Sequence, residues 1–254
     1  MNDLQRDFLE IITQLRTHLE YQKALGLRHV GMPVRRPAPA GAPPATQPGP
    51  ARTSKPVAAA PRPVAQPTGL SAVLKEISGC SRCALSSFRT TIVFGEGNPD
   101  ADLVFVGEAP GSEEERQGRP FAGAAGQLLT DIIVKGMNLK PDAVYLCTIV
   151  KCKPPVDRGP RQEELDTCEL FFRKQIQAIK PRVIVALGDL AAQTLLKSKE
   201  NIAALRGAWH TYQSIPVMPT FPPEHLVKHP EDKKFTWEDI KQVMAKLGIK
   251  VTKG

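Results

Sequence analysis

Leu103-Val104-Phe105-Val106-Gly107-Glu108-Ala109-Pro110-Gly111 is the stretch that decides the fold. Its first four residues form a continuous apolar run, which is typical of a buried strand, and a loop bounded by glycines follows directly. Similar apolar runs lie at residues 144–146 with 149–150, 183–187 and 215–218. Helical patterns lie between the runs at residues 126–137, 162–179 and 190–196, and a last one covers 237–247. Strands that alternate with helices predict a three-layer α/β/α sandwich, with helices on both faces of a mainly parallel central sheet.

The loop at residues 107–111 is the first place to look for a functional site. In sheets of this kind, ligands bind beyond the carboxyl ends of the strands. The glycines allow a close approach of the backbone, and the following turn can present N–H groups to an anion or a carbonyl group. The pattern lacks G-x-x-x-x-G-K, so it is a weak phosphate-binding signal, and an alternative is that the glycines serve only the turn.

The composition restricts the class of protein. The chain has 254 residues, of which 41% are hydrophobic, and this fraction excludes a wholly disordered chain. Its apolar runs all fall short of the ~18 residues that a membrane-spanning helix needs, so we expect no membrane association. The N-terminus lacks the basic region, apolar core and cleavage site of a secretory signal, and a cytoplasmic location is therefore expected.

Three zones divide the chain, and the last of them, residues 69–254, carries the strand and helix patterns of a folded domain. Residues 1–30 are expected to contain an amphipathic helix, because apolar side chains recur at three- and four-residue steps before Gly26. A helix this short is marginal in water, so its apolar stripe needs a partner: another copy, another protein or its own domain. The stripe consists of Leu4, Phe8, Ile11, Ile12, Leu15 and Leu19.

Residues 31–68 are predicted to be a disordered linker. They hold 11 of the 24 prolines and nine alanines, and such a segment cannot bury a core. They also carry five basic residues and no acidic residue, which is most of the net charge of +8. This basic excess favours a polyanion such as nucleic acid as a partner, although a merely solvated linker has the same composition.

Four of the five cysteines have a spacing that is typical of metal ligands. Cys80 and Cys83 form a C-x2-C pair in a predicted loop, Cys152 follows a predicted strand, and Cys168 lies early in a predicted helix. Four thiolates placed in this way can together bind one metal centre, and the spacing allows either zinc or an iron–sulfur cluster. The alternative is a set of buried structural cysteines. Cys147 lies within a predicted strand and is expected to be a core residue.

A second motif, Gly118-Arg119-Pro120-Phe121-Ala122-Gly123, places an aromatic ring between small residues ahead of a helix. Such a ring can stack on a nucleobase. Spacing alone favours an ordinary core residue.

Taken in order, these motifs resemble the family 4 uracil-DNA glycosylases, the iron–sulfur enzymes of bacteria and archaea. The resemblance covers about residues 72–247 and leaves out the N-terminal helix and the linker. It rests on residues 107–111, on Gly118-Arg119-Pro120-Phe121-Ala122-Gly123-x2-Gly126-Gln127-Leu128-Leu129, on Val150-Lys151-Cys152-Lys153-Pro154-Pro155, on Leu187-Gly188-x2-Ala191-Ala192, on Leu205-Arg206-Gly207-x-Trp209, and on Trp237-Glu238-Asp239.

The resemblance implies the uracil-DNA glycosylase fold and a repair enzyme that extrudes a deaminated base, uracil foremost, and hydrolyses its N-glycosidic bond. It implies that the base stacks on Phe121 and that its carbonyl group meets the backbone of a loop containing Gly107, Glu108 and Ala109. Glu108 is then a candidate catalytic carboxylate, and the acidic run at 113–115 matches the family's acidic pair. The resemblance implies a [4Fe-4S] cluster rather than zinc, held by Cys80, Cys83, Cys152 and Cys168.

Contacts with DNA also follow from the resemblance. Leu226 has the position of a wedge that enters the duplex behind an extruded base. Lys228 and Arg206 lie in basic segments that match the family, as do Lys151 and Lys153.

Two positions depart from the family pattern. Thr148 replaces the asparagine that would read the edge of the flipped uracil, and a single hydroxyl replaces a donor and an acceptor on one amide. Pro222 replaces the catalytic histidine, and proline has no N–H donor. His225, three residues further on, is the candidate substitute. These departures leave two alternatives open: an iron–sulfur protein that binds DNA or damaged bases with little hydrolysis, and a glycosylase for hypoxanthine or xanthine.

Overall fold

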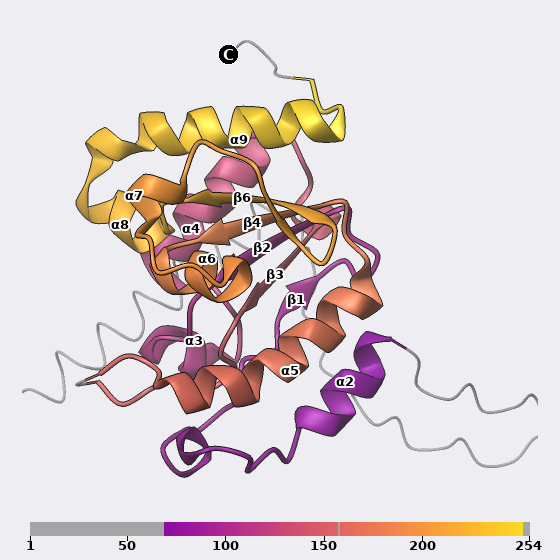
Figure 1. Cartoon of the computed structure of the whole chain (residues 1–254), viewed down its shortest axis with the longest axis vertical. Helices are drawn as coiled ribbons and strands as arrows, with labels where there is room; N and C mark the ends of the chain where they lie inside the picture. The colour runs from indigo at the N-terminus through magenta and orange to yellow at the C-terminus, as the bar shows by residue number, and fades with distance from the viewer. Residues whose placement is uncertain (1–68, 157, 251–254) are drawn as a thin grey trace, which may run out of the picture. The chain divides into compact units, whose positions relative to one another are not determined.

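The central sheet of the computed structural model contains six strands in the order β1-β3-β2-β4-β6-β5 (Figure 1). The structure describes residues 69–156 and 158–250. The four inner strands are mutually parallel, and the short strands β1 and β5 pair antiparallel at the two edges. The strands are β1 (Glu96–Gly97), β2 (Leu103–Gly107), β3 (Val144–Thr148), β4 (Val183–Leu187), β5 (His210–Tyr212) and β6 (Ile215–Thr220).

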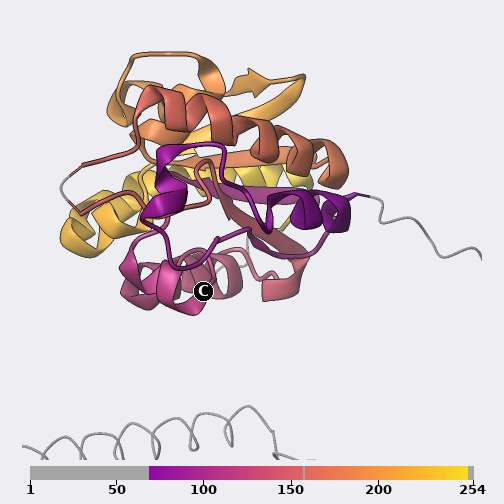
Figure 2. The ribbon, with the colours of Figure 1, turned by 90° about the horizontal axis from the view of Figure 1, so that it is seen from below.

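Helices cover both faces of this sheet, as Figure 2 shows for α5 and α4. The α-helices are α2 (Leu70–Ile77), α3 (Ser112–Gln117), α4 (Gly123–Asp131), α5 (Gln162–Ile179), α6 (Asp189–Leu196), α7 (Ile202–Leu205), α8 (Pro223–Lys228) and α9 (Lys233–Leu247). A π-helical turn, η2 (Ile132–Gly136), extends α4, and 3-10 turns form η1 (Ala84–Ser87), η3 (Pro141–Ala143) and η4 (Pro230–Asp232).

Side chains that alternate along the strands build two cores. Val104 and Val106 of β2 face α5 and α6, where Phe172 and Ala191 pack. The intervening Phe105 belongs to the opposite core, with residues of α4 and α9. Since β2 and β4 are buried on both faces, their sequences are continuous apolar runs rather than alternating ones. The predicted three-layer α/β/α sandwich is therefore confirmed.

Some bounds differ from the sequence prediction. The helix expected at 126–137 begins at Gly123 and ends in the π-helical turn, and the helix expected at 237–247 begins at Lys233. β3 stops at Thr148 because Ile149 and Val150 bend toward β2, where their N–H groups donate to the carbonyl oxygens of Gly107 and Glu108. In the described part of the chain, every helix is too short or too polar to cross a membrane.

The parallel register brings the site-bearing ends of the strands together. Gly107 at the end of β2 pairs with Thr148 at the end of β3, and Leu187 ends the neighbouring strand β4. All three residues line one cavity at the carboxyl edge of the sheet. This is where the topology of a parallel sheet places a ligand.

Candidate active site

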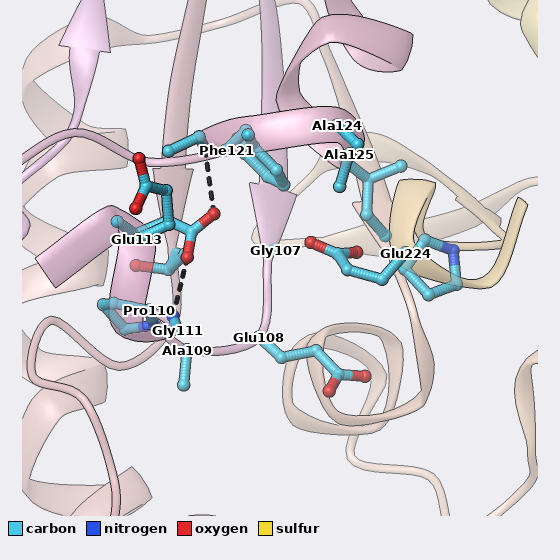
Figure 3. A pocket seen from close by; sticks show the side chains of 16 residues that line it. Gly107, Glu108, Ala109, Pro110, Gly111, Glu113, Phe121, Ala124, Ala125 and Glu224 are labelled. Carbon is cyan, nitrogen blue, oxygen red and sulfur yellow. Dashed lines mark hydrogen bonds between the residues drawn. The ribbon is translucent and has the colours of Figure 1, made fainter. Parts of the chain in front are cut away.

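A pocket of about 510 Å³ lies at this edge of the sheet (Figure 3). The loop after β2 forms its floor, and residues from the start of α4 and from α8 form its walls. Its volume falls in the usual range for small-molecule sites, ~300–1,000 Å³. The lining residues are Gly107, Glu108, Ala109, Pro110, Gly111, Glu113, Glu114, Phe121, Ala122, Gly123, Ala124, Ala125, Thr148, Leu187, Pro222 and Glu224.

The ring of Phe121 is placed against the strand end by two glycines. A Cβ atom at Gly107 would lie 2.8 Å from Cζ of Phe121, and one at Gly126 would lie 1.6 Å from its carbonyl oxygen. The backbone of Phe121 has φ of 55°, which is in the left-handed region and costs energy in a residue that carries a side chain. The half-buried ring packs against the core that contains Phe105, and it also lines the pocket, where it is available to a flat ligand.

Glu114 holds the two pocket loops together. Its Oε2 accepts a hydrogen bond from the N–H of Gly111 at 3.0 Å, and its Oε1 accepts one from the N–H of Ala122 at 2.8 Å. Both bonds are drawn in Figure 3. The neighbouring carboxylates have other roles: Glu115 is buried and accepts from the N–H of Thr90 at 2.9 Å, whereas Glu113 pairs with Arg116.

Glu108 lines the pocket, but its carboxylate is turned to the start of α6. Its Oε1 accepts a hydrogen bond from the N–H of Leu190 at 3.0 Å, and a side chain at Gly188 would collide with it. Burial raises the pKa of Glu108, the charges of Asp189 and Glu224 add to this, and the Leu190 N–H opposes it. Glu108 thus anchors the loop to a helix N-terminus, where a negative charge is favourable.

Thr148 lines the pocket and is only 2% exposed. Its hydroxyl group donates a hydrogen bond to the carbonyl oxygen of Val150 at 2.7 Å. Because this bond uses the single hydroxyl proton, Thr148 can offer a ligand only acceptor lone pairs and a methyl group.

The structure places His225, the expected substitute for the missing histidine, outside the lining of the pocket. Pro222 lines the pocket, but His225 does not. Nε2 of His225 lies 2.6 Å from Oδ2 of Asp232, and its ring is stacked between Phe221 and His229 at centroid distances of 4.7 Å and 4.5 Å. These contacts hold the imidazole outside the cavity.

Glu224 is a pocket residue that sequence reasoning missed. It lies two residues beyond Pro222, and its carboxyl group points into the cavity (Figure 3). Since α8 is only six residues long, its sequence gives no periodic pattern that shows which side chains face the pocket. The pocket lining contains four glutamates, and no histidine, lysine or arginine of the described residues belongs to it.

The four candidate metal ligands come from three separate segments. Cys80 and Cys83 follow α2, Cys152 follows β3, and Cys168 lies on α5. Burial raises the pKa of Cys168 to about 11, and the charges of Cys152 and Cys83 contribute to this rise. Burial likewise raises the pKa of Cys152, with contributions from Cys83 and Cys80. The thiols are therefore neighbours in space.

Hydrogen-bond donors surround these thiols. The N–H of Lys151 donates to Sγ of Cys168 at 3.3 Å, and the guanidinium of Arg89 donates to Sγ of Cys152 at 3.6 Å and to the carbonyl oxygen of Cys80. In the described residues, no three or more His, Cys, Asp or Glu side chains are grouped so that they could hold a metal ion. Cys147 is fully buried in β3, as expected.

Comparison with known proteins identifies the family. The model of the uracil DNA glycosylase superfamily matches residues 94–241, which is more than half of the chain. The chain belongs to this superfamily. It is 38% identical over 182 residues to the type-4 uracil-DNA glycosylase of Sulfurisphaera tokodaii, an alignment that covers 68% of this chain and 83% of the relative. It is 40% identical over 176 residues to the type-4 enzyme of Thermotoga maritima, covering 67% and 90%.

The guanidinium of Arg206, a candidate DNA contact of this glycosylase domain, has partners within the fold. It donates to both carboxylate oxygens of Asp239, at 2.8 Å and 3.0 Å, and to the carbonyl oxygen of Phe235 at 2.6 Å. Asp239 also accepts from the hydroxyl of Thr220 at 2.6 Å. Only 17% of the Arg206 side chain is exposed. Arg206 therefore ties the segment after α7 to α9.

Leu226, the expected wedge, has a fully buried side chain in this structure, with 0% exposure. It lines an apolar groove with Trp237 and Ile240, beneath α8. The next residue, Val227, is 46% exposed, and Lys228 is exposed as expected.

The two lysines near the third cysteine also have internal partners. Lys151 is fully buried, and its Nζ donates to the carbonyl oxygen of Thr148 at 2.6 Å. Lys153 forms an ion pair with Glu115 at 3.7 Å. Neither is a solvated phosphate contact in this structure.

Proposed function

We propose that this chain is a DNA repair glycosylase that hydrolyses the N-glycosidic bond of uracil extruded from DNA. The observation that carries the proposal is the half-buried ring of Phe121, a residue with a positive backbone φ, which lies against a glycine-bounded loop at the carboxyl ends of β2 and β3. An extruded base stacks on such a ring. The relatives named type-4 uracil-DNA glycosylases support the choice of uracil.

The pocket residues have distinct tasks in this reaction. Phe121 stacks on the base, and we assign the N–H groups of Glu108 and Ala109 to its carbonyl oxygen. As the bond breaks, positive charge builds on the sugar and negative charge on the base. The carboxylates of Glu113 and Glu114 stabilise the sugar cation, because fixed charges at a site act strongly on developing charge. DNA is the macromolecular partner that this reaction requires.

The test is an excision assay on duplex and single-stranded oligonucleotides that carry uracil, hypoxanthine or xanthine. We expect release of uracil by the parent and a large loss of release in Phe121→Ala, and the melting temperature of the variant checks its fold. Tight binding without release of any base would instead support a damage-binding protein. Preferred release of hypoxanthine or xanthine would show that the pocket has a different substrate.

The binding-protein alternative has specific support. The hydroxyl group of Thr148 donates its hydrogen bond to the carbonyl oxygen of Val150, and Pro222 has no hydrogen-bond donor. His225 lies outside the cavity. These three facts predict slow chemistry, so the excision assay is run under single-turnover conditions with enzyme in excess.

Thr148→Asn is expected to raise selectivity for uracil over cytosine. An asparagine amide offers one donor and one acceptor to the edge of the base, and a good bidentate pair contributes ~1–3 kcal/mol of discrimination. The measurement is the ratio of single-turnover rates on uracil and cytosine oligonucleotides. Thr148→Val is the matched control, because it removes the hydroxyl group without adding an amide. An unchanged ratio in Thr148→Asn would show that position 148 does not read the base.

We also propose that Cys80, Cys83, Cys152 and Cys168 hold a [4Fe-4S] cluster. In such a cluster each thiolate binds a different iron, so the sulfur atoms stand further apart than around a single zinc ion. The charges of these thiols act on one another, and N–H donors lie beside two of them, which supports a shared sulfur-liganded site. When bound, the cluster supplies a cross-link between three segments of the domain.

The assignments for the N-terminal part stay predictions, because residues 1–68 lie outside the described residues. They are an amphipathic helix within 1–30 that binds another protein, a second copy or its own domain, and a basic linker at 31–68 that precedes the glycosylase domain at 69–254 in the sequence. The cytoplasmic location is likewise a prediction.

A further inference from the structure

We propose that Glu224 is a catalytic residue of this chain, and that its carboxyl group donates a hydrogen bond to the departing base. The inference rests on the proposed function and deepens it. It answers the chemical problem that Pro222 creates, which is how the negative charge on the leaving base is stabilised without a histidine.

Geometry selects Glu224 among the residues that α8 brings to the pocket. These residues are Pro222 and Glu224, and the pyrrolidine ring of Pro222 carries no donor. The residue as a whole is exposed, but its carboxyl group lies inside the cavity and points toward the strand end at Gly107 (Figure 3). Glu224 therefore approaches the cavity from the same short segment in which the family resemblance expects the histidine.

The other polar side chains of the lining have partners. Glu108 accepts from Leu190, and Glu114 accepts from both pocket loops. Glu113 pairs with Arg116, and Thr148 donates to a carbonyl oxygen. In the described part of the chain, the carboxyl group of Glu224 forms neither an ion pair nor a hydrogen bond with another side chain. Among the four glutamates that line the pocket, Glu224 is therefore the one whose carboxyl group remains available to a ligand.

The surroundings of Glu224 favour its protonated form. Burial raises the pKa of its carboxyl group, and the charge of Glu114 adds to the rise, whereas a hydrogen bond from its own backbone N–H and the charge of Lys228 oppose it. The other charged groups facing the cavity are Glu108 and Glu113, both acidic, and the parts of α4 and β4 that line it carry no charge. Bound DNA excludes water and brings phosphates close, and both effects raise the pKa further. A protonated carboxyl group can donate a hydrogen bond, whereas a carboxylate can only accept one.

The step is heterolytic. The bond between C1′ of the sugar and N1 of uracil breaks, and its electron pair moves into the ring and onto a carbonyl oxygen. Glu224 shares its proton with that oxygen and passes it to the base. A water molecule adds to C1′ and releases a proton to solvent, and the Glu224 carboxylate regains a proton from solvent. The products are free uracil and an abasic sugar, so the sum is hydrolysis.

The experiment compares Glu224→Ala and Glu224→Gln with the parent in single-turnover excision of uracil across a range of pH. The parent rate should fall as pH rises through the raised pKa of Glu224, because only the protonated form donates. Glu224→Ala should be about 10²–10³-fold slower, as expected for one lost donor. Glu224→Gln should be intermediate and independent of pH over the same range, because its amide donates without titrating.

The matched control is Glu231→Gln, which removes a glutamate from the neighbouring turn η4, outside the pocket, and should match the parent in rate and pH profile. Binding of each variant to a uracil duplex and its melting temperature show that fold and binding are retained. A parent-like rate in Glu224→Ala overturns the inference alone. The inference is also overturned if the parent rate rises with pH and Glu224→Gln is as slow as Glu224→Ala, because the carboxylate would then be the active form. A parent that releases no base overturns the proposed function as well.

Discussion

Replacing Pro222 with histidine in the Glu224→Ala variant should restore about 10²–10³-fold in the single-turnover rate of uracil excision. Pro222 lines the pocket as the residue before α8, so an imidazole at this position can reach the base that Glu224 otherwise meets. Pro223 remains as the first residue of the helix, so the helix start keeps its preferred residue. The gain should appear in the chemical step and not in DNA binding, because the new donor meets charge that develops only in the transition state.

The same change in the parent background is the control. There Glu224 already supplies a donor, so Pro222→His should add much less than it adds in Glu224→Ala. Two groups that act on one base are coupled and not additive. Equal gains in both backgrounds would show that positions 222 and 224 act independently, and no gain in either would show that position 222 does not reach the base.

Iron should be lost from each of four single variants, in which Cys80, Cys83, Cys152 or Cys168 is replaced by alanine. The four thiols come from three segments that are far apart in sequence, so a cluster with one ligand missing no longer holds these segments together. We expect a fall in solubility together with the loss of iron. The measurements are the iron and zinc content and the visible absorbance of protein purified without oxygen.

Cys147→Ala is the matched control, because Cys147 is fully buried in β3 and belongs to the core. This variant should keep its iron and its colour. Stoichiometric zinc without iron in the parent, or loss of iron in Cys147→Ala alone, would contradict the assignment of the ligands.

The fold could be predicted where the sequence pattern is long or continuous. α5 and β4 have the predicted bounds, because an amphipathic period over 18 residues and a run buried on both faces are local signals. β1 and β5 were missed, since they contain two and three residues and are defined by their pairing with β3 and β6. The extension of the last helix to Lys233 was also missed, because its first turn is mostly polar.

The candidate site was predicted in part. The structure brings Gly107, Ala109, Phe121 and Thr148 together in one pocket, because motifs that follow neighbouring parallel strands must meet at one edge of the sheet. The roles of residues on α8 could not be read in this way. The rotation of this short helix is set by its packing on α4, and that packing buries Leu226 and turns Glu224 inward.

Charge in the sequence was an unreliable guide to DNA contacts for the same reason. The partner of Arg206 is Asp239, which lies 33 residues away on a different helix, and Lys151 is buried beside the backbone of Thr148. No local pattern distinguishes an arginine paired within the fold from one that faces a phosphate. The exposed Lys228 remains the position at which the sequence prediction and the surface agree.

The two hydrogen bonds that Glu114 accepts have a consequence for which substitutions the pocket tolerates. One side chain fixes the separation between the floor of the pocket and the wall that carries Phe121. The width of the slot for a flat base therefore does not depend on the outer surface of α3, where the exposed Arg116 and Gln117 bind to Glu113. Substitutions on that outer surface leave the slot unchanged, whereas a change at Glu114 alters both sides of the slot at once.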